Sequence, residues 1–270
     1  MTKKLQTFHK YKSIIIKKSL QLVSITQRIS QIKQPRGGYL NRKSFEVKQL
    51  EPVTFIDTKY ENIAPQTIGL VVDYLTRMVI NQDKEKSFAI SLTGAKLAGE
   101  LQTAESLLKE INDNDDLSII KACQLVNYDM VYRAGSMPKE FKIPDQDTIN
   151  NIKSLINRSL SFFNQIGEVK MDGFTFEGAY TSIIDTGDGD FLTEDTLWDF
   201  KVSKQLPQKN STLQLVIYYL MGKASQKPTF ENIRYIGIYN PRFNQIYKYD
   251  MSQADSEMIE TIQKRVIGYD

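Results

Sequence analysis

The stretch "GDGDFLTEDTLWDFKVSK", residues 187–204, has the alternating pattern of a β-hairpin. If Thr193–Thr196 form the turn, Leu192 faces Leu197 and the pairing continues outward along both strands. Successive side chains then point to opposite faces. One face carries Asp188, Asp190, Leu192, Asp199 and Lys201, and the other carries Phe191, Trp198, Phe200 and Val202. The aromatic face is therefore predicted to be a core face of a sheet.

This register places two carboxylates side by side. Asp190 faces Asp199, and residues directly opposite in an antiparallel pair have Cβ atoms about 4.5–5.5 Å apart, close enough to share a divalent cation. Without a cation the two acids would repel each other and weaken the hairpin. Lys201 could neutralise the pair, or position a water or a phosphate oxygen. The alternative is a solvent-facing strand of ordinary acids, with Lys201 as a surface ion-pair partner.

The composition limits the chemistry that the chain can use. With 270 residues, 41% of them hydrophobic, we expect one domain with an insertion or an appendage. His9 and Cys123 are the only histidine and cysteine, which argues against disulfides, structural zinc and a Ser-His-Asp or Cys-His mechanism. Acid–base or metal chemistry must then come from carboxylates, lysines or tyrosines. The apolar runs are too short for a membrane span and no signal peptide is evident, so we expect a cytoplasmic protein without a membrane partner.

Positive charge is concentrated at the N-terminus. Residues 1–48 contain 12 Lys or Arg and the single acid Glu46, whereas the rest of the chain carries 23 basic and 31 acidic residues. Such a tract attracts polyanions, of which nucleic acid is a common one. The alternative is a solvated basic face on an N-terminal helix. Four further basic residues are interpreted as structural: Arg133, Arg234, Arg242 and Lys248.

The periodicity of the apolar residues changes along the chain. Helical spacing predicts helices at about 12–33, 64–80, 96–112, 117–133 and 147–166. Beyond residue 172, short β-branched and aromatic runs predict strands, interrupted by one helix at 211–223 and followed by a helix near 253–267. This order indicates a mixed α/β or α+β core, with a central mixed sheet flanked by helices and an N-terminal helical region.

The hairpin and the helix after it resemble a known pattern. "GDGDFLTEDTLWDFK" is similar to the hairpin of the PD-(D/E)XK nuclease superfamily, in which an Asp on one strand is followed by D-x-K on the next. In "QLVIYYLMG", the Q-x-x-x-Y spacing of Gln214 and Tyr218 resembles the helix motif of the RecB-like branch. The resemblance implies a restriction-endonuclease-like core of α-β-β-β-α-β order. The chain would then consist of a basic segment, 1–50, a helical region or insertion, 51–147, and a nuclease core, 148–270.

The same resemblance implies roles for individual residues. The metal ligands of the hairpin would be Asp190, Asp199 and the carbonyl of Phe200. Lys201 would be the catalytic lysine. Gln214 and Tyr218 would orient the substrate or the network of the active site.

Three positions leave questions open. An upstream helix of this branch carries a further acid or a histidine, and the candidates for it are Asp73 in "IGLVVDYLTR", Glu177 and Asp188. Gln214 has a structural alternative, because "STLQ" is also a capping-box sequence with Ser211 as the N-cap. Gly189 departs from the pattern, since it stands where a proline is expected before the aspartate.

The resemblance implies a Mg²⁺-dependent DNA nuclease of phage biology, recombination or defence. Oxygen ligands suit Mg²⁺, with Mn²⁺ as a substitute. Nucleic acid is the expected partner, with DNA favoured over RNA, and a helicase or a larger complex is compatible as a protein partner. Two alternatives stand beside it: a catalytically silent nuclease-fold module that binds nucleic acid or protein, and a scaffold in which the hairpin acids form a solvated face.

Overall fold

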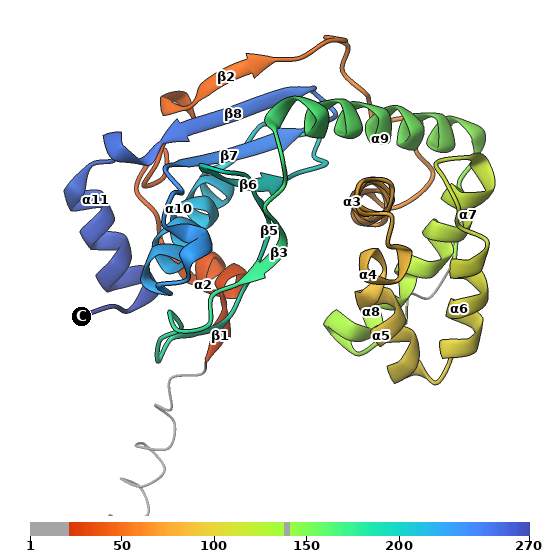
Figure 1. Ribbon diagram of the computed structural model, residues 1–270, viewed down its shortest axis with the longest axis horizontal. Helices are drawn as coiled ribbons and strands as arrows, with labels where there is room; N and C mark the ends of the chain where they lie inside the picture. Colours follow the sequence, from red (N-terminus) through yellow and green to blue (C-terminus); the bar gives the residue numbers. More distant parts are fainter. Residues whose placement is uncertain (1–21, 138–140) are drawn as a thin grey trace, which may run out of the picture.

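A computed structural model describes residues 22–137 and 141–270 of the chain. The described part consists of a six-stranded sheet with helices on both faces and a second group of helices beside it (Figure 1). The predicted mixed α/β class is therefore confirmed. Residues 1–21, which hold part of the basic tract and the start of the helix predicted at 12–33, lie outside the described residues.

The sheet has the strand order β2-β8-β7-β6-β5-β3. Its strands are β2 (Glu46–Gln49), β3 (Met171–Thr175), β5 (Asp188–Leu192), β6 (Thr196–Phe200), β7 (Tyr235–Asn240) and β8 (Gln245–Asp250). β6 and β7 pair in parallel and the other neighbours pair antiparallel, so the sheet is mixed. β1 (Val23–Ser24) and β4 (Ile184–Thr186) form a separate parallel pair. β2 was not predicted from the sequence, because all four of its residues are exposed and it lacks apolar alternation.

Next to its turn, the hairpin of β5 and β6 has the predicted register, with Phe191 opposite Trp198 and Leu192 opposite Leu197. The paired ladder ends there, so the predicted pairing of Asp190 with Asp199 is not part of it. Both faces of the hairpin are buried near its turn. The aromatic pair packs on one side of the sheet and the leucine pair on the other. The aspartates further along the two strands therefore lie where the buried part of the hairpin ends.

One face of the sheet is covered by α9 (Gln146–Ile166). Phe162 on α9 stacks on Tyr239 with a centroid distance of 3.9 Å and meets the Trp198 ring edge to face. Gly237 makes room for this packing, because a Cβ there would come within 2.5 Å of the Trp198 ring. The aromatic face of the hairpin is thus a core face, as predicted.

The opposite face is covered by α10 (Lys209–Ala224), together with α2 (Ile25–Gln31) and α11 (Ser256–Thr261) (Figure 1). α10 begins at Lys209 with Gln208 as its N-cap. Ser211 therefore lies inside the helix, and the capping-box alternative for Gln214 is wrong. The side chain of Gln214 is left to bond elsewhere.

A helical region between residues 65 and 134 packs around a core of its own. It contains α3 (Pro65–Asn81), α4 (Lys84–Ser87), α5 (Ala89–Ala98), α6 (Leu101–Lys109), α7 (Asp116–Leu125) and α8 (Asp129–Ala134). α3 matches its predicted range, α6 lies within the helix predicted at 96–112, and the helix predicted at 117–133 is divided into α7 and α8. Gly99 ends α5 in a left-handed conformation, and a 3₁₀ turn at Val126–Tyr128 separates α7 from α8.

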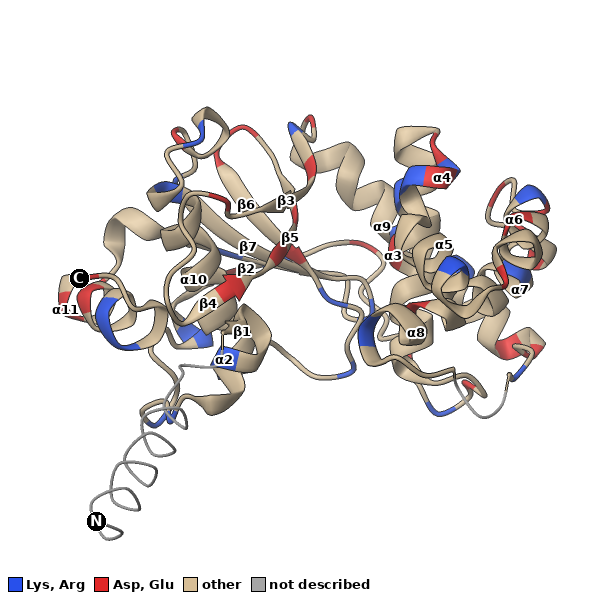
Figure 2. Cartoon of the chain, turned by 90° about the horizontal axis from the view of Figure 1, so that it is seen from below, with Lys and Arg blue, Asp and Glu red and all other residues tan. Residues whose placement is uncertain are grey.

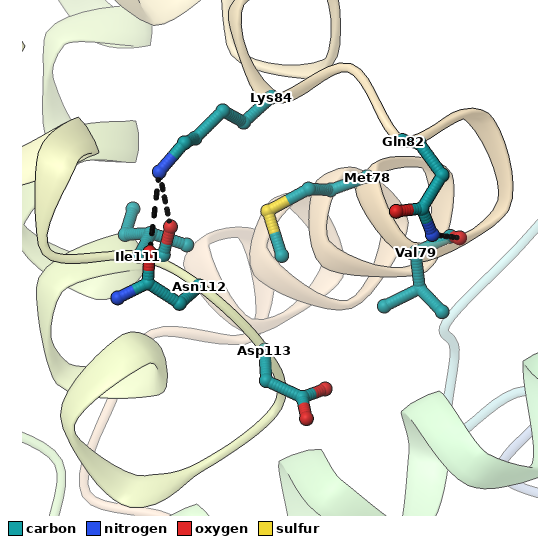
Figure 3. A pocket seen from close by; sticks show the side chains of 7 residues that line it. All are labelled: Met78, Val79, Gln82, Lys84, Ile111, Asn112 and Asp113. Atoms are coloured by element: carbon teal, nitrogen blue, oxygen red, sulfur yellow. Dashed lines mark hydrogen bonds between the residues drawn. The ribbon is translucent and has the colours of Figure 1, made fainter.

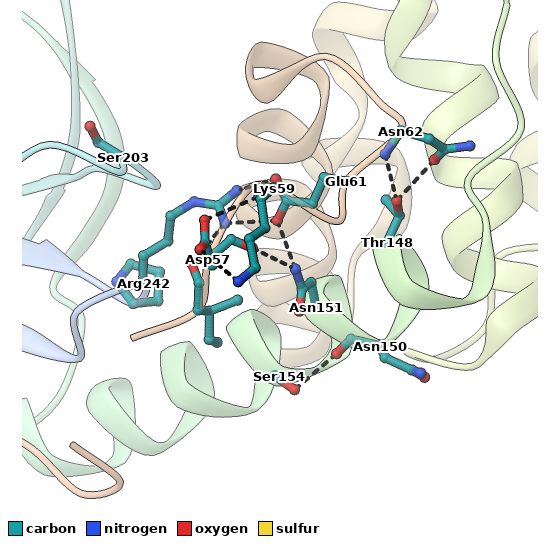
Figure 4. Close-up of polar contacts among 12 residues, drawn as sticks. Asp57, Lys59, Glu61, Asn62, Thr148, Asn150, Asn151, Ser154, Ser203 and Arg242 are labelled. Carbon is teal, nitrogen blue, oxygen red and sulfur yellow. Dashed lines mark hydrogen bonds and ion pairs between the residues drawn. The ribbon is translucent and has the colours of Figure 1, made fainter. Parts of the chain in front are cut away.

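The helical region is joined to the sheet at several places. The long helix α9 runs from the sheet to the helical region (Figure 1). Its side chains lie in the cores of both. In addition, Arg242 in the turn between β7 and β8 makes a bidentate ion pair with Glu61, with Nη1 to Oε1 at 2.7 Å and Nη2 to Oε2 at 2.9 Å (Figure 4). The two side chains are only 1% and 2% exposed. The structural interpretation of Arg242 is therefore confirmed.

Residues 22–50 belong to the same core as the sheet. Ile25, Ile29, Leu40 and Phe45 are buried in it, and β2 pairs with β8 at one edge. The described part of the N-terminal segment is thus built into the fold. No helix in the described ranges is long and apolar enough to cross a membrane.

Candidate carboxylate site

Charged side chains from the hairpin and from α3 lie close together. β5 and β6 supply Asp190 and Asp199, Lys201 follows the end of β6, and α3 supplies Asp73 and Arg77. Figure 2 shows acidic residues on β5 near the middle of the molecule, with α3 further to the right. The structure therefore brings the predicted hairpin residues together with one of the candidate upstream acids. We refer to these five residues and Asp172 as the carboxylate site.

Asp199 is the most deeply buried acid of this site, with a relative exposure of 2%. Its Oδ1 lies 3.0 Å from Nζ of Lys201. Its Oδ2 is buried and has no hydrogen-bond partner among the described residues. Leaving a buried polar atom unpaired costs about 1–3 kcal/mol, and more for a charged group. Such an atom indicates a role other than stabilising the fold.

Asp190 has one oxygen firmly bound and the other loosely held. Oδ2 accepts a hydrogen bond of 2.6 Å from the backbone amide of Phe200. Oδ1 lies 3.7 Å from Nη2 of Arg77, beyond ordinary hydrogen-bond distance. Phe200 thus contacts the site through its N–H, and the role of its carbonyl as a metal ligand stays a prediction.

Arg77 connects α3 to the sheet. Its Nε donates to Oδ1 of Asp73 at 2.7 Å, and its Nη1 donates to Oδ1 of Asp172 on β3. The side-chain amide of Asn81 donates to the other oxygen of Asp172 at 2.5 Å. With Asp190 on its third side, the guanidinium is surrounded by three carboxylates.

Arg77, Asn81 and Asp172 were not predicted from the sequence as site residues. A signal existed for the first two, because Asp73, Arg77 and Asn81 are spaced four residues apart and share one face of α3. No local pattern could pair this face with Asp172, which lies 95 residues from Arg77. Their contact depends on how α3 packs beside the sheet.

Burial and neighbouring charges shift the pKa values of the site. Burial raises the pKa of Asp199 to about 6; Lys201 opposes the rise, whereas the charges of Asp190 and Asp73 add to it. Burial also raises the pKa of Asp73, against the opposing charge of Arg77. For Lys201, burial alone would lower the pKa, but Asp199 and Asp190 outweigh it and raise the pKa. Lys201 is therefore a cation at neutral pH.

The oxygen donors of the site fit a hard divalent cation. Among the described residues, four carboxylates (Asp73, Asp172, Asp190 and Asp199) stand against two cations (Arg77 and Lys201). The free Oδ2 of Asp199 and the loosely held Oδ1 of Asp190 are ligands of the kind that Mg²⁺ binds. Within the described ranges, no three His, Cys, Asp or Glu side chains are already grouped around one metal position. A bound Mg²⁺ would therefore keep water or substrate oxygens among its ligands, as it usually does in proteins.

Gln214 and Tyr218 are paired on α10, with Nε2 of Gln214 donating to the Tyr218 hydroxyl at 2.6 Å. The Tyr218 ring is buried against Phe174 and Phe176. Burial raises the pKa of Tyr218 well above its ordinary value, and the charge of Asp199 adds to the rise. The hydroxyl therefore stays protonated beside the carboxylate site.

The other two candidate upstream acids are placed differently. The side chain of Glu177 is 61% exposed, and Lys227 and the Thr175 hydroxyl lower its pKa to about 2. No contact among the described residues joins Glu177 to the carboxylate site. Asp188 is exposed, and its charge contributes to the raised pKa values of Lys201 and Arg133.

Gly189 has a packing role next to Asp190. A Cβ at this position would come within 2.1 Å of the Phe174 ring. Phe174 is buried in the core under α10. A larger residue would push the ring away, so glycine is the residue that fits before Asp190 in this chain.

A pocket of about 360 Å³ lies at the C-terminal end of α3, and none of the carboxylate-site residues lines it (Figure 3). Lys84 extends into it, but its Nζ donates to the carbonyl of Ile111 at 2.8 Å. Asp113, at the opposite rim, accepts a hydrogen bond of 2.8 Å from the amide of Asn114. These charged groups serve the local structure, so the carboxylate site is the better candidate for chemistry.

The chain was compared with known proteins at the level of sequence and of structure. No protein-family model, no curated protein and no solved structure matches it. A function for the carboxylate site has to be argued from its geometry and from the sequence motifs.

Proposed function

We propose that this protein is a Mg²⁺-dependent nuclease with the core of the PD-(D/E)XK superfamily and the motifs of its RecB-like branch. The observation that carries the proposal is the buried Asp199 carboxylate, with Oδ1 held 3.0 Å from Lys201 and Oδ2 without a partner among the described residues. Asp190 stands beside it with one loosely held oxygen. Paired acids next to a lysine suit a cation and a phosphate, whereas they would weaken an ordinary hairpin.

The order of the elements supports the proposal. α9, β3, β5, β6, α10 and β7 follow one another in the α-β-β-β-α-β order of the superfamily core, with the short β4 outside the six-stranded sheet. Asp190 lies on the second of these sheet strands and Asp199 on the third, and the Gln214 and Tyr218 pair lies on the helix that follows. Fold order alone does not specify an activity, so it adds weight only together with the site.

The residues have distinct tasks in phosphodiester hydrolysis. A bound Mg²⁺ would neutralise charge on the phosphate and lower the pKa of a water molecule. Asp190 and Asp199 would hold it through their available oxygens. Lys201, kept protonated by these acids, would stabilise negative charge that develops on the phosphate. The protonated Tyr218, fixed by Gln214, would orient the substrate or the side chains around it.

The substrate that we propose is DNA. The basic tract of residues 1–48 would bind a polyanion through salt-dependent contacts to phosphates, without reading its sequence. Part of this tract lies outside the described residues, so this role rests on its composition. A helicase or a larger complex as a protein partner is also part of the proposal.

A second candidate function is a catalytically silent module that binds nucleic acid or protein. One observation favours it: the guanidinium of Arg77 already lies among three of the four carboxylates. A positive side chain in that place would leave only the hairpin acids for a metal. The unpaired Oδ2 of Asp199 favours the nuclease, since a binding module gains nothing from it.

A cleavage assay tests the nuclease proposal. Labelled single- and double-stranded DNA and RNA are incubated with the protein and Mg²⁺, Mn²⁺ or EDTA. The wild type is compared with Asp199→Asn and Lys201→Met, and with Glu260→Gln as a control at an exposed acid of α11 that pairs with Lys264. We expect metal-dependent cleavage that is lost in the two site variants and kept in the control.

The outcome separates the two candidates. A wild type that binds nucleic acid with every metal but never cleaves it would support the silent module. Cleavage that persists in EDTA, or that survives Asp199→Asn, would contradict the proposed site.

A further inference from the structure

Arg77 is held in a way that sets it apart from a surface arginine. Its side chain is 16% exposed, and its three nitrogens reach acids on three elements: Asp73 on α3, Asp172 on β3 and Asp190 on β5. Nη1 also lies 3.4 Å from the backbone carbonyl of Asp190. The planar guanidinium thus occupies the space between these carboxylates with its donors directed at them.

The three acids share Arg77 as their counter-charge, although in their present positions no three acids among the described residues are grouped around one metal position. Carboxylates that share a small space raise one another's pKa unless a positive charge lies between them. In many hydrolases of phosphate esters this charge is a second metal ion, about 3.5–4 Å from the first. Here the guanidinium of Arg77 lies between the acids instead, bound by hydrogen bonds to Asp73 and Asp172.

The carboxylate site therefore has two unequal halves. In one half, Arg77 satisfies Asp73 and Asp172, and Asn81 fixes Asp172 further. In the other half, Lys201 pairs with only one oxygen of Asp199 and the second oxygen stays unpaired among the described residues. Asp190 lies between the halves, bound firmly by Phe200 and only loosely by Arg77.

We infer that Arg77 takes the place of a second metal ion, so that the carboxylate site binds one divalent cation, between Asp190 and Asp199. The inference rests on the proposed function, because it presumes that the hairpin acids bind a metal. It makes Arg77 a positioning residue that holds Asp73, Asp172 and Asp190 in place. It also makes the helical region part of the site, since α3 supplies this charge.

Removing the guanidinium should open a second metal position. In Arg77→Met, the acids Asp73, Asp172 and Asp190 lose their shared counter-charge, and a divalent cation can replace it. In Arg77→Lys, the ammonium keeps a positive charge at this place. We expect one bound Mn²⁺ per chain in the wild type and in Arg77→Lys, and two in Arg77→Met.

The test is a titration of the full-length protein with Mn²⁺ in the absence of nucleic acid. Calorimetry and the electron paramagnetic resonance signal of free Mn²⁺ measure how many ions bind to each chain. Arg234→Met is the matched control, because Arg234 pairs with Asp250 at an exposed edge of the sheet. It should bind one Mn²⁺ like the wild type. The double variant Arg77→Met/Asp172→Asn should also bind one, since it lacks an acid of the second position.

Each result decides the inference. Two Mn²⁺ in the wild type, or a folded Arg77→Met that still binds one, would overturn it and leave the proposed nuclease standing. A wild type that binds no Mn²⁺ would overturn both. If Arg77→Met unfolds in EDTA, Mn²⁺ should restore its fold by replacing the lost charge, and failure to restore it would also overturn the inference.

Discussion

Among the places where the described residues bury charged side chains, two are built in opposite ways. The pair of Arg242 and Glu61 has one acid and one base, joined by two hydrogen bonds of 2.7 and 2.9 Å (Figure 4). The carboxylate site has more acids than bases among the described residues, and Asp199 keeps an unpaired oxygen at 2% exposure. Burial of charge is common to both places, so burial does not mark function. The feature that sets the carboxylate site apart is the buried, unpaired oxygen of Asp199.

The physical reason lies in what burial requires of a charge. A buried ion needs a partner and satisfied hydrogen bonds, and removing one member of such a pair strands the other. The pair at Glu61 meets this requirement within the chain. The carboxylate site does not meet it among the described residues, and under the proposed function a cation from solution would complete it.

The largest effect on stability is expected at the pair of Arg242 and Glu61, whose charges balance each other. Glu61→Gln would leave Arg242 buried without its partner and should lower the free energy of unfolding by about 3–5 kcal/mol. Urea denaturation of the wild type and the variant measures this loss. A change below about 1 kcal/mol would show that the pair is not the structural element that its burial suggests.

The next largest effect concerns cleavage. Lys201→Met removes the positive charge next to Asp199 and should reduce the cleavage rate by a factor on the order of 10²–10³, as expected for one electrostatic group of an active site. The side chain is 37% exposed, so the fold should tolerate the change. Single-turnover cleavage measured beside urea denaturation separates the two effects, and a variant with an unchanged rate would exclude Lys201 from the chemistry.

A small effect on stability is expected at the carboxylate site, where acids outnumber basic residues among the described residues. In EDTA, Asp199→Asn should change the free energy of unfolding by less than about 1 kcal/mol, or increase it, because the change removes a desolvated charge that Asp190 and Asp73 repel. The contrast with Glu61→Gln is the point of this measurement. A loss of stability as large as that of Glu61→Gln would mean that Asp199 is a structural ion.

The smallest effect is expected at Cys123, in the core of the helical region. Burial raises its thiol pKa to about 12, so the thiol stays protonated at pH 8 and should not react with alkylating reagents in the native state. The thiol pKa is higher in the folded state than in the unfolded state, where it is about 8.5. Its contribution to the stability of the folded state is therefore fully present below about pH 8.5 and is lost as the pH rises toward the pKa of the folded state. Fast alkylation of the native wild type would contradict this, and fast alkylation of a site variant would reveal a disturbed helical region.

The hairpin could be predicted from the sequence because the pattern that specifies it is local. The alternation of side chains fixes the pairing of Leu192 with Leu197, and the same alternation sets Asp190 and Asp199 apart from the aromatic face. The Q-x-x-x-Y spacing likewise places Gln214 and Tyr218 one turn apart on one helix. Each of these depends on residues within a few positions of one another.

The half of the carboxylate site that contains Arg77 could not be predicted in this way. The contact of Arg77 with Asp172 joins α3 to β3 across 95 residues and depends on the packing of the helical region against the sheet. The depth of Asp199 depends on α10 and α9 covering both faces, which no pattern within the hairpin specifies. The polar edge strand β2 was missed for a different reason, because none of its side chains is buried.

The most direct test of the account is thermal unfolding of the wild type and of Asp199→Asn with and without Mg²⁺. A cation that binds only the folded state stabilises it by about 2.7 kcal/mol at a concentration of 100 times Kd. We predict that Mg²⁺ raises the Tm of the wild type in a concentration-dependent way and leaves that of Asp199→Asn unchanged. A wild-type Tm that does not respond to Mg²⁺, or an equal rise in both proteins, would contradict the claim that this site binds a divalent cation.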